Sequence, residues 1–476
     1  MADEPRLEAG TIGLRHALSQ GFIANGPLAS VTVAVTGAAV FGLGALPLAF
    51  VLGSVLILFS VNTLYQFSRH VLSAGGIYAF TRAGFGERSG FATGITYGLS
   101  NLLLVVGNAM IAPRLVEFAM ASAGVAVPAG VPVAVALVTV LVPYGITCLR
   151  LRPSLDYGIV TALLEVLAVV VLSVVFVVGA GSANTVAVFD PANALDGWSG
   201  LATGMVLASV ALGGSDNVVA LGEESRAPAR TIKRGVLAVQ LWVIGIYLLA
   251  SYALTIGWGP SKMASFAESG SPLLVLVERA AGPWPVALIM LLALNSIVGV
   301  NVAVNISTAR LIFDTARRGL TPERLAAVHA RHRTPVAALT VAVLVQLAVL
   351  LVATAAWGLT TGFVVVVAAG GAGFVLVQLV NTAALISFAR RHDLFGIWYR
   401  GVPAAGCVLT VYLLYTSVVP LELPRSIGVI AMLAVFAGCA GWASLVARSN
   451  PTTERDGVHG RPRQASRLGL DREPPA

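Results

Sequence analysis

Two stretches of this chain contain no Asp, Glu, Lys or Arg: residues 16–68, which number 53, and residues 334–389, which number 56. An α-helix that crosses the hydrocarbon core of a bilayer needs about 20 apolar residues, so each stretch is long enough for two crossings. Charged residues make up only 11% of the chain, whereas soluble domains contain about 25%. A water-soluble fold is therefore excluded, and we expect an all-α polytopic membrane protein.

The remaining crossings are counted from shorter segments that are poor in charge. Eight segments each hold one crossing: residues 89–113 (extended to about 120), 131–149, 157–181, 197–222, 235–257, 283–309, 401–420 and 426–447. Together with the two crossings in each long stretch, the sequence predicts twelve transmembrane helices.

Lys and Arg residues are distributed unevenly between the two sides. A cytoplasmic N-terminus puts 26 of the 30 on the inner side and three, Lys262, Arg279 and Arg425, on the outer side, with Arg114 inside the third helix. Because short cytoplasmic loops keep positive charge, we expect a multi-pass protein of the cytoplasmic (inner) membrane with both termini cytoplasmic. The net charge of +8 is then mainly a topology signal that also favours anionic lipids of the bilayer. It does not indicate nucleic-acid binding.

Two predicted helices are interrupted by glycine and polar residues well inside the membrane. The first contains Asn25, Gly26 and Pro27, and the sixth contains the run G-G-S-D-N at 213–217. Helices broken in corresponding positions are the best sequence indication of a transporter site near the bilayer midplane. The two breaks lie five helices apart. Because five is odd, a second five-helix unit enters from the opposite side, which predicts an inverted repeat.

This symmetry divides the chain into five parts. They are a cytoplasmic N-terminal arm (1–14), a first five-helix repeat with the following outer loop (15–200), a second five-helix repeat (201–389), helices 11 and 12 (390–447) and a cytoplasmic tail (448–476). The arm and the tail are too polar to build a core, so we expect both to be disordered.

An unwound helix leaves N–H and C=O groups that must find partners in the membrane. Half-helix N-termini suit a carboxylate, and freed carbonyl groups suit an ammonium group or a cation, so one zwitterion would satisfy both. The alternative is that Gly-Pro only kinks the first helix and the Gly pair only permits close helix packing. The predicted substrate-binding residues are Ala24, Asn25, Gly26, Asn101, Gly213, Gly214, Ser215, Asp216 and Asn217.

Two acidic residues lie well inside predicted crossings, where a carboxylate costs roughly 2.5–3.5 kcal/mol and indicates function by default. Asp216 can pair with a substrate amine, and Glu165 is either the carrier of a coupling proton or a structural acid bonded to neighbouring helices. Asp216 and Glu165 are therefore the predicted coupling residues. Arg114 and Glu117 are expected to form an ion pair near the outer end of the third helix.

Polar side chains also recur at helical spacing on three helices. They either face a central cavity or form hydrogen bonds between helices. These residues are Tyr97, Asn101 and Asn108, then Asn301, Asn305 and Thr308, and finally Gln378 and Asn381.

Four segments are similar to motifs of one permease family. S-A-G-G-I-Y at 73–78 and G-E-E-S-R-A-P-A-R-T-I at 222–232 resemble segments of this family, A-L-P-L-A-F at 45–50 is similar to the start of its second helix, and A-R-R-G-L-T-P at 316–322 resembles the loop after its eighth helix. By these motifs the chain resembles the amino acid/polyamine/organocation (APC) superfamily. The resemblance implies a leucine-transporter-type 5+5 inverted repeat plus two C-terminal helices. It also implies transport of amino acids or related amines by alternating access.

The chain departs from that family's usual pattern in places that bear on the substrate. The family's first-helix break commonly reads G-S-G-I-F, and its amides take the substrate carboxylate, but in the matching stretch 24–28 Pro27 lacks an N–H. The usual G-F-E of helix 6 is G-S-D at 214–216, which removes an aromatic gate and shortens the acid. Gln66 stands where many members have Glu, and the helix-5 lysine of some proton-coupled relatives is absent. Substrate and coupling ion, H⁺ or Na⁺, therefore stay open.

We expect a secondary active transporter, or permease, of an amino acid or related small amine. An exporter or exchanger of an amino-acid-derived metabolite is the alternative within transport, and a non-transporting amino-acid sensor is the alternative of another class. Metalloprotease, Asp-rich and P-loop motifs are absent, and the three cysteines are not closely spaced. We therefore expect no enzyme activity, no cofactor and no metal site. The oligomeric state is not predicted.

Overall fold

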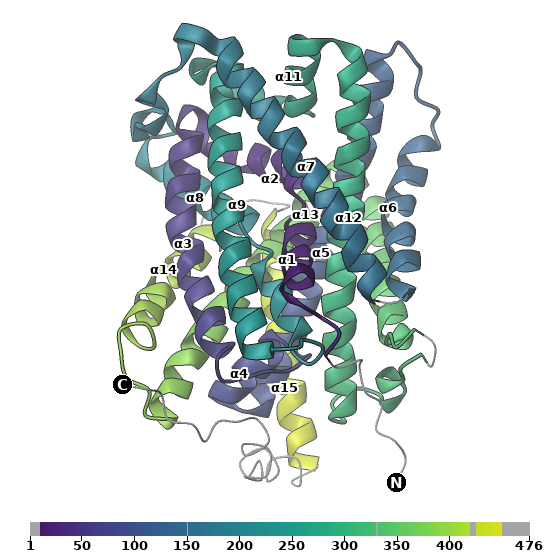
Figure 1. Ribbon diagram of the computed structural model, residues 1–476, viewed down its shortest axis with the longest axis vertical. Helices are drawn as coiled ribbons and strands as arrows, with labels where there is room; N and C mark the ends of the chain where they lie inside the picture. Colours follow the sequence, from purple (N-terminus) through teal and green to yellow (C-terminus); the bar gives the residue numbers. More distant parts are fainter. Residues whose placement is uncertain (1–9, 150, 330–331, 419–424, 450–476) are drawn as a thin grey trace.

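The computed structural model describes residues 10–149, 151–329, 332–418 and 425–449. The regular secondary structure of this part of the chain is helical, apart from one isolated bridge between Ile12 and Ser225. Figure 1 shows long helices standing side by side, with the short helix α11 (Pro272–Ala281) at one end and α4 (Ile77–Phe85) at the other. We call these the α11 end and the α4 end.

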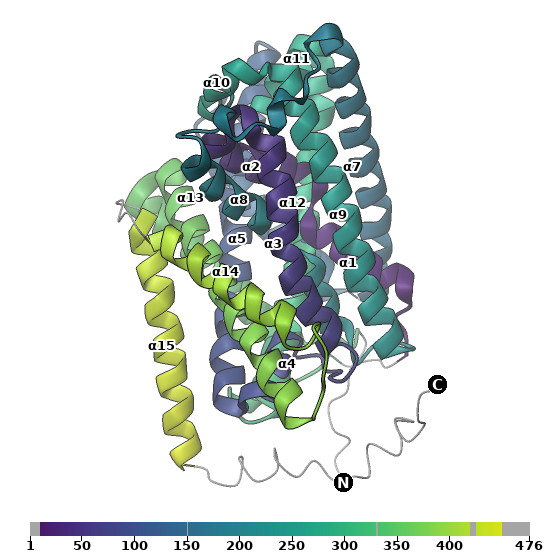
Figure 2. The same ribbon diagram turned by 90° about the vertical axis from the view of Figure 1, so that its left-hand side faces the viewer.

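Eight helical segments in the described part are long and apolar enough to cross a membrane. The prediction of an all-helical, polytopic membrane protein is therefore confirmed. Six segments hold α5 (Glu87–Ser122), α6 (Val131–Cys148), α7 (Leu151–Ala180), α8 (Trp198–Ala211), α9 (Pro228–Trp258) and α12 (Pro283–Arg317), and the other two are Leu14–Phe67 and Val336–Arg391. Two shorter apolar stretches lie in α14 (Gly401–Val418) and α15 (Arg425–Ser449), at the side of the bundle (Figure 2).

The first of the two longest segments is not a single rod. It comprises α1 (Leu14–Asn25), α2 (Pro27–Gly42), the short helix η1 (Leu43–Ala45) and α3 (Leu46–Phe67). Figure 2 shows α3 returning from α2 toward the α4 end, and Leu43, where the path changes, has a φ of 40°.

The second long segment, α13 (Val336–Arg391), contains a kink at Gly358, whose φ of 71° is not helical. The pieces before and after the kink are each longer than the roughly 20 residues that a crossing needs. The twelve-helix count and the inverted repeat nevertheless stay predictions, because apolar length alone does not define separate crossings.

The outside of the bundle is apolar along whole helices. On α7, for example, Val160, Leu163, Leu167 and Val178 are 59–71% exposed. Contiguous exposed apolar surface of this kind marks a membrane-facing region.

Both ends of the bundle contain ordered elements that the sequence analysis did not predict. Helices α4, α10 (Met263–Glu268) and α11 were not predicted. At the α4 end, residues 10–13 of the expected disordered arm are fixed, because Ile12 N–H donates to Glu224 O (3.0 Å) and Arg226 N–H donates to Ile12 O (2.9 Å). Residues 1–9 and 450–476 lie outside the described residues, and 448–449 belong to α15.

Candidate functional site

The first predicted break lies between α1 and α2. Gly26 adopts left-handed backbone with φ 55° and ψ 75°, and its N–H donates to Phe22 O (3.1 Å). A Cβ atom at Gly26 would lie 2.2 Å from Val300 Cγ2. Both the backbone conformation and the close approach of α12 therefore require glycine here.

The second predicted break comes at the end of α8. The chain leaves the α-helix after Ala211 and passes through Gly214, with φ 121°, before it resumes as the 3₁₀ helix η5 (Ser215–Leu221). A Cβ atom at Gly214 would be 3.1 Å from both the backbone N and the Cβ of Asn25. The two interruptions are therefore in contact with each other.

Asn25 joins the two breaks through its side-chain amide. Its Nδ2 donates to Gly213 O (2.7 Å) and Ala211 O (3.2 Å), while its Oδ1 accepts from the Tyr247 hydroxyl (2.7 Å). The sequence analysis assigned Asn25 to substrate binding. In the structure its hydrogen-bonding groups hold the two unwound segments together, and a direct substrate contact stays a prediction.

Asp216 is buried, with 7% of its surface exposed. Its Oδ1 accepts from the Gly214 N–H (3.0 Å), and its Oδ2 accepts from the Tyr97 hydroxyl of α5 (2.6 Å). These recorded partners are neutral. A buried carboxylate is costly unless a positive charge pairs with it, so Asp216 is suited to meeting a cation.

A cavity of about 450 Å³ begins at the two breaks and extends from them to the α11 end. Its lining runs from buried Asp216 to exposed Val40, Glu268 and Gly270. Ligand sites commonly measure about 300–1,000 Å³, so the cavity can hold a small organic molecule. The predicted residues that line it are Ala24, Asn25, Asn101, Gly213, Gly214, Asp216 and Asn217.

The structure does not bring two of the predicted residues to this cavity. Ser215 instead donates to Gln240 Oε1 (3.0 Å), and Gln240 Nε2 donates to Leu212 O (3.1 Å). Gly26 packs against Val300 and Ser296. Both residues shape the backbone around the cavity floor.

Arg114 lies at the mouth of the cavity rather than in the expected ion pair. Its Nη2 donates to Thr360 Oγ1 of α13 (2.5 Å), and no ion pair with Glu117 is present in the described part of the chain. The expected i, i+3 pair is therefore wrong, because Arg114 reaches across to a neighbouring helix.

Glu165 of α7 lies beside the first break but outside the cavity lining. It is 3% exposed, its Oε2 accepts from the Ser296 hydroxyl (2.5 Å), and its Oε1 is 3.5 Å from Asn295 Nδ2. The Ser296 oxygen also accepts from the Ala29 N–H at the start of α2 (3.0 Å). Glu165 is thus linked to the start of α2 through Ser296, and its role in coupling stays a prediction.

The three polar stripes separate into two groups. On α12, Asn301 Nδ2 donates to Thr139 O (2.9 Å), and Asn305 Oδ1 accepts from Gln346 (2.7 Å), so these residues connect helices. Asn101 and Asn108 line the cavity. Tyr97, Gln378 and Asn381 line a separate pocket of about 20 Å³ on another side of Asp216.

The α4 end is closed by ion pairs. Arg310 of α12 and Glu224, which lies just after η5, form a two-pronged pair, with Nε–Oε2 at 2.6 Å and Nη2–Oε1 at 3.1 Å. Both side chains are only 3% exposed. This pair fixes the second break to α12 on the side opposite the cavity mouth.

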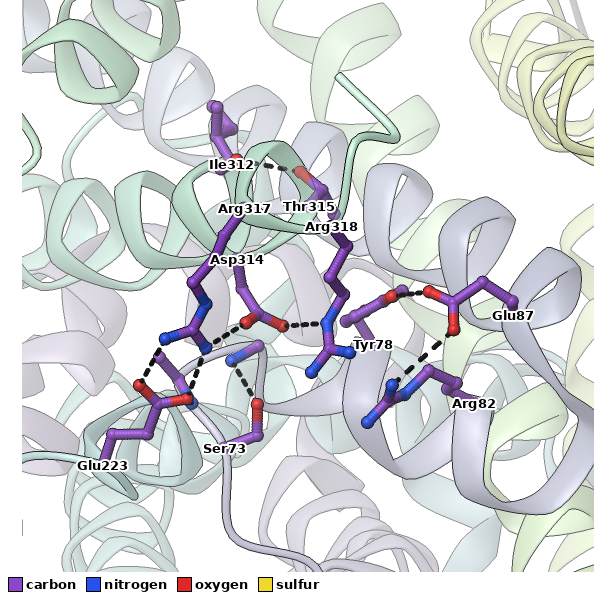
Figure 3. A network of polar contacts seen from close by, with 12 residues as sticks. Ser73, Tyr78, Arg82, Glu87, Glu223, Ile312, Asp314, Thr315, Arg317 and Arg318 are labelled. Atoms are coloured by element: carbon purple, nitrogen blue, oxygen red, sulfur yellow. Dashed lines mark hydrogen bonds and ion pairs between the residues drawn. The ribbon is translucent and has the colours of Figure 1, made fainter. Parts of the chain in front are cut away.

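A second polar network also lies at the α4 end (Figure 3). Arg317 contacts Glu223 (2.8 Å) and Asp314 (2.6 Å), and Arg318 donates to Asp314 (3.2 Å). Beside them the Tyr78 hydroxyl donates to Glu87. Burial, and then the Glu87 charge, raise the pKa of Tyr78, so the hydroxyl keeps its proton. The network connects three of the four segments that carry the family resemblance.

Some site residues gave no signal in the sequence. Tyr247 and Gln240 each stand alone among apolar neighbours, and Ser296 has only Asn295 as a polar neighbour, so no spacing or motif marked them. Their partners lie on other helices, and only the fold brings these groups together.

Comparison with known proteins agrees with these observations. A family model described as amino acid permease matches residues 24–440. A branched-chain amino acid permease of Bacillus subtilis is 25% identical over 313 residues, which are 63% of this chain and 65% of that protein. A low-affinity putrescine importer of Escherichia coli is 25% identical over 300 residues, 61% and 64% of the two chains.

An uncharacterised transporter of Mycobacterium tuberculosis is 28% identical over 267 residues, 55% of this chain and 56% of that protein. This chain thus spans 56–65% of the length of these three curated relatives. All three names are those of transporters, in agreement with the expectation of a transporter rather than an enzyme.

Proposed function

The chain belongs to the amino acid permease family, and from this premise we propose that it is a secondary active transporter of an amino acid or related small amine. The observation that carries the proposal is a cavity whose floor is built by two touching helix breaks and the buried Asp216 carboxylate. An ammonium group that entered the cavity would supply the positive charge that Asp216 lacks. Main-chain polar groups freed by the breaks suit a small polar substrate.

The proposed architecture has twelve crossings, with a 5+5 inverted repeat and two further helices. The break after Asn25 and the break after Ala211 support it, since they lie in the first and sixth proposed crossings. The kink at Gly358 and the reversal at Leu43 would each divide a long segment into two crossings. The Lys and Arg distribution supports a cytoplasmic position for the α4 end and for both termini.

Alternating access is supported by the contrast between the two ends. The cavity reaches exposed residues at the α11 end, whereas Arg310–Glu224 and the surrounding ion pairs join the elements of the α4 end. We propose that this is the state open to the outside. Release on the inner side would then require these ion pairs to separate.

The comparisons leave two substrate classes open. One relative is named for branched-chain amino acids, which carry a carboxylate, and another for putrescine, which does not. Coupling to H⁺ or Na⁺ through Asp216 or Glu165 is likewise a proposal. Counterflow separates uptake from exchange, because unlabelled substrate preloaded in vesicles accelerates entry of labelled substrate when exchange is the native mode.

Uptake into proteoliposomes by the Asp216→Asn variant tests the proposal. Asparagine keeps the size of the side chain but removes its charge, and a hydrogen bond to a charged group contributes about 1.5–3 kcal/mol. We expect uptake of amine-bearing substrates to fall about 10- to 100-fold at subsaturating concentration.

The matched control is Asp190→Asn, which makes the same change at an exposed loop residue that caps a short helix. It should transport like the parent. Equal uptake by Asp216→Asn and the parent, with both inserted and folded, would contradict the assigned role of Asp216.

A further inference from the structure

The first break offers a substrate few main-chain donors, because three of the four N–H groups from residue 26 to residue 30 are hydrogen-bonded within the protein. Gly26 N–H donates to Phe22 O (3.1 Å), and Ser30 N–H donates to Gly26 O (2.8 Å). Pro27 has no N–H. The remaining two N–H groups, those of Leu28 and Ala29, are the donors at the start of α2 that could receive an anion.

A carboxylate of the protein itself already occupies this position. Ala29 N–H donates to Ser296 Oγ (3.0 Å), whose hydroxyl in turn donates to Glu165 Oε2 (2.5 Å). Glu165 comes from α7 and Ser296 from α12, and both helices pack beside the first break (Figure 1). A negative group at a helix N-terminus is favourable, so Glu165 satisfies the end of α2 without a ligand.

The part of the cavity floor that the second break forms, by contrast, presents acceptors. The Asp216 carboxylate has lone pairs beyond the two bonds recorded for it. Asn217 Oδ1, from the same break, has no hydrogen-bond partner among the described residues. Arg114, the positively charged residue of the lining, lies at the mouth of the cavity. The exposed Glu268 also lines the cavity there.

We propose that the substrate is an organic cation, a primary amine without an adjacent carboxylate, because Glu165 occupies the place at the start of α2 that a substrate carboxylate would need. This inference rests on the proposed transport function and selects between the two substrate classes left open by the comparisons. An α-amino acid would bring its carboxylate next to Glu165, where like charges repel and where the Ala29 N–H is already bonded to Ser296. An amine brings only the charge that Asp216 can pair with.

Binding of matched compounds to the purified protein in nanodiscs tests the inference. Two pairs differ only by a carboxylate, isopentylamine against leucine and putrescine against ornithine. We expect the amine of each pair to bind at least about tenfold more tightly, which corresponds to about 1.4 kcal/mol. Equal or tighter binding of the amino acids would overturn the inference.

The Glu165→Ala variant supplies a second test, in which the preference for the amine should decrease. It removes the carboxylate and frees the donors at the start of α2, so the affinity for leucine relative to isopentylamine should rise about tenfold. The control is Asp156→Ala, which removes another acid of α7, one that contacts Arg15 and His16 and is 53% exposed. An unchanged ratio in a folded Glu165→Ala protein would overturn the assigned role of Glu165.

Failure of the inference and failure of the transporter proposal give different results. Uptake of leucine or ornithine in preference to the amines would overturn the inference and leave the transporter intact. A folded protein that neither binds nor transports any of the four compounds would overturn both. The comparison in the unaltered protein decides the matter even when a variant does not fold.

Discussion

Substitution of Gly26 by alanine is the sharpest test of the first break. The residue has φ 55°, and placing a side chain in left-handed backbone costs about 1–2 kcal/mol. The new Cβ would lie 2.2 Å from Val300 Cγ2 and 3.2 Å from Ser296 Oγ, and overpacking of this kind typically costs about 1–3 kcal/mol. The two effects together predict a loss of about 2–5 kcal/mol in stability.

The assay is unfolding of the purified protein in nanodiscs, followed by tryptophan fluorescence against denaturant and temperature. Gly245→Ala in α9 is the matched control, because a Cβ atom there meets nothing within 4 Å. It should be neutral or stabilise by up to about 1 kcal/mol, since alanine favours a helix over glycine. A Gly26→Ala protein as stable and as active as the control would refute the left-handed, closely packed break.

Two further substitutions test the contacts around the site. Arg310→Ala leaves Glu224 buried without its cation, which predicts a loss of about 3–5 kcal/mol in the free energy of unfolding. The control Arg15→Ala changes a side chain that is 73% exposed and should cost less than about 1 kcal/mol. Equal denaturation midpoints for the two variants would contradict the buried pair. Asn25→Ala leaves Gly213 O and the Tyr247 hydroxyl without their partner, at about 1–3 kcal/mol for each buried group, and should lower both stability and uptake. An Asn25→Ala protein indistinguishable from the parent in both measurements would show that the bridge does not hold the breaks together.

The positions of the two breaks could be predicted from sequence because their causes are local. Gly26 next to Pro27, and the Gly213–Gly214 pair, are residues that permit backbone other than α-helix. The long charge-free stretches likewise reveal apolar helices, since the bilayer demands a fixed length. The 3₁₀ helix η5, into which the chain passes after the second break, could not be predicted from the same residues.

The roles of Asn25 and Glu165 depend on tertiary contacts and could not be predicted. The sequence predicts that Asn25 binds substrate, but in the structure its amide nitrogen donates to carbonyl oxygens 186 and 188 residues away in the sequence. From the sequence alone, Glu165 is either the carrier of a proton or a structural acid. Its position at the start of α2 depends on Ser296, 131 residues distant, and no pattern within either helix indicates that meeting.

Polar spacing on a helix indicated which faces are polar, but not what they meet. Tyr97 and Asn101 lie one turn apart on α5, and Tyr97 lines the small pocket while Asn101 lines the cavity, both of which include Asp216 in their lining. Asn301 and Asn305 have the same spacing on α12 and bond to α6 and α13 instead. The distinction is set by how the helices pack, which the sequence of a single helix does not contain.

The most direct test of the account is an experimental density map of the protein with one compound bound. The compound is the best transported of the two amines and two amino acids compared above. The account predicts ligand density between the two breaks, with the ammonium nitrogen about 2.7–3.2 Å from the Asp216 carboxylate. Ligand density elsewhere in the bundle, or continuous helices through residues 26 and 213–214 with no cavity beside them, would contradict it.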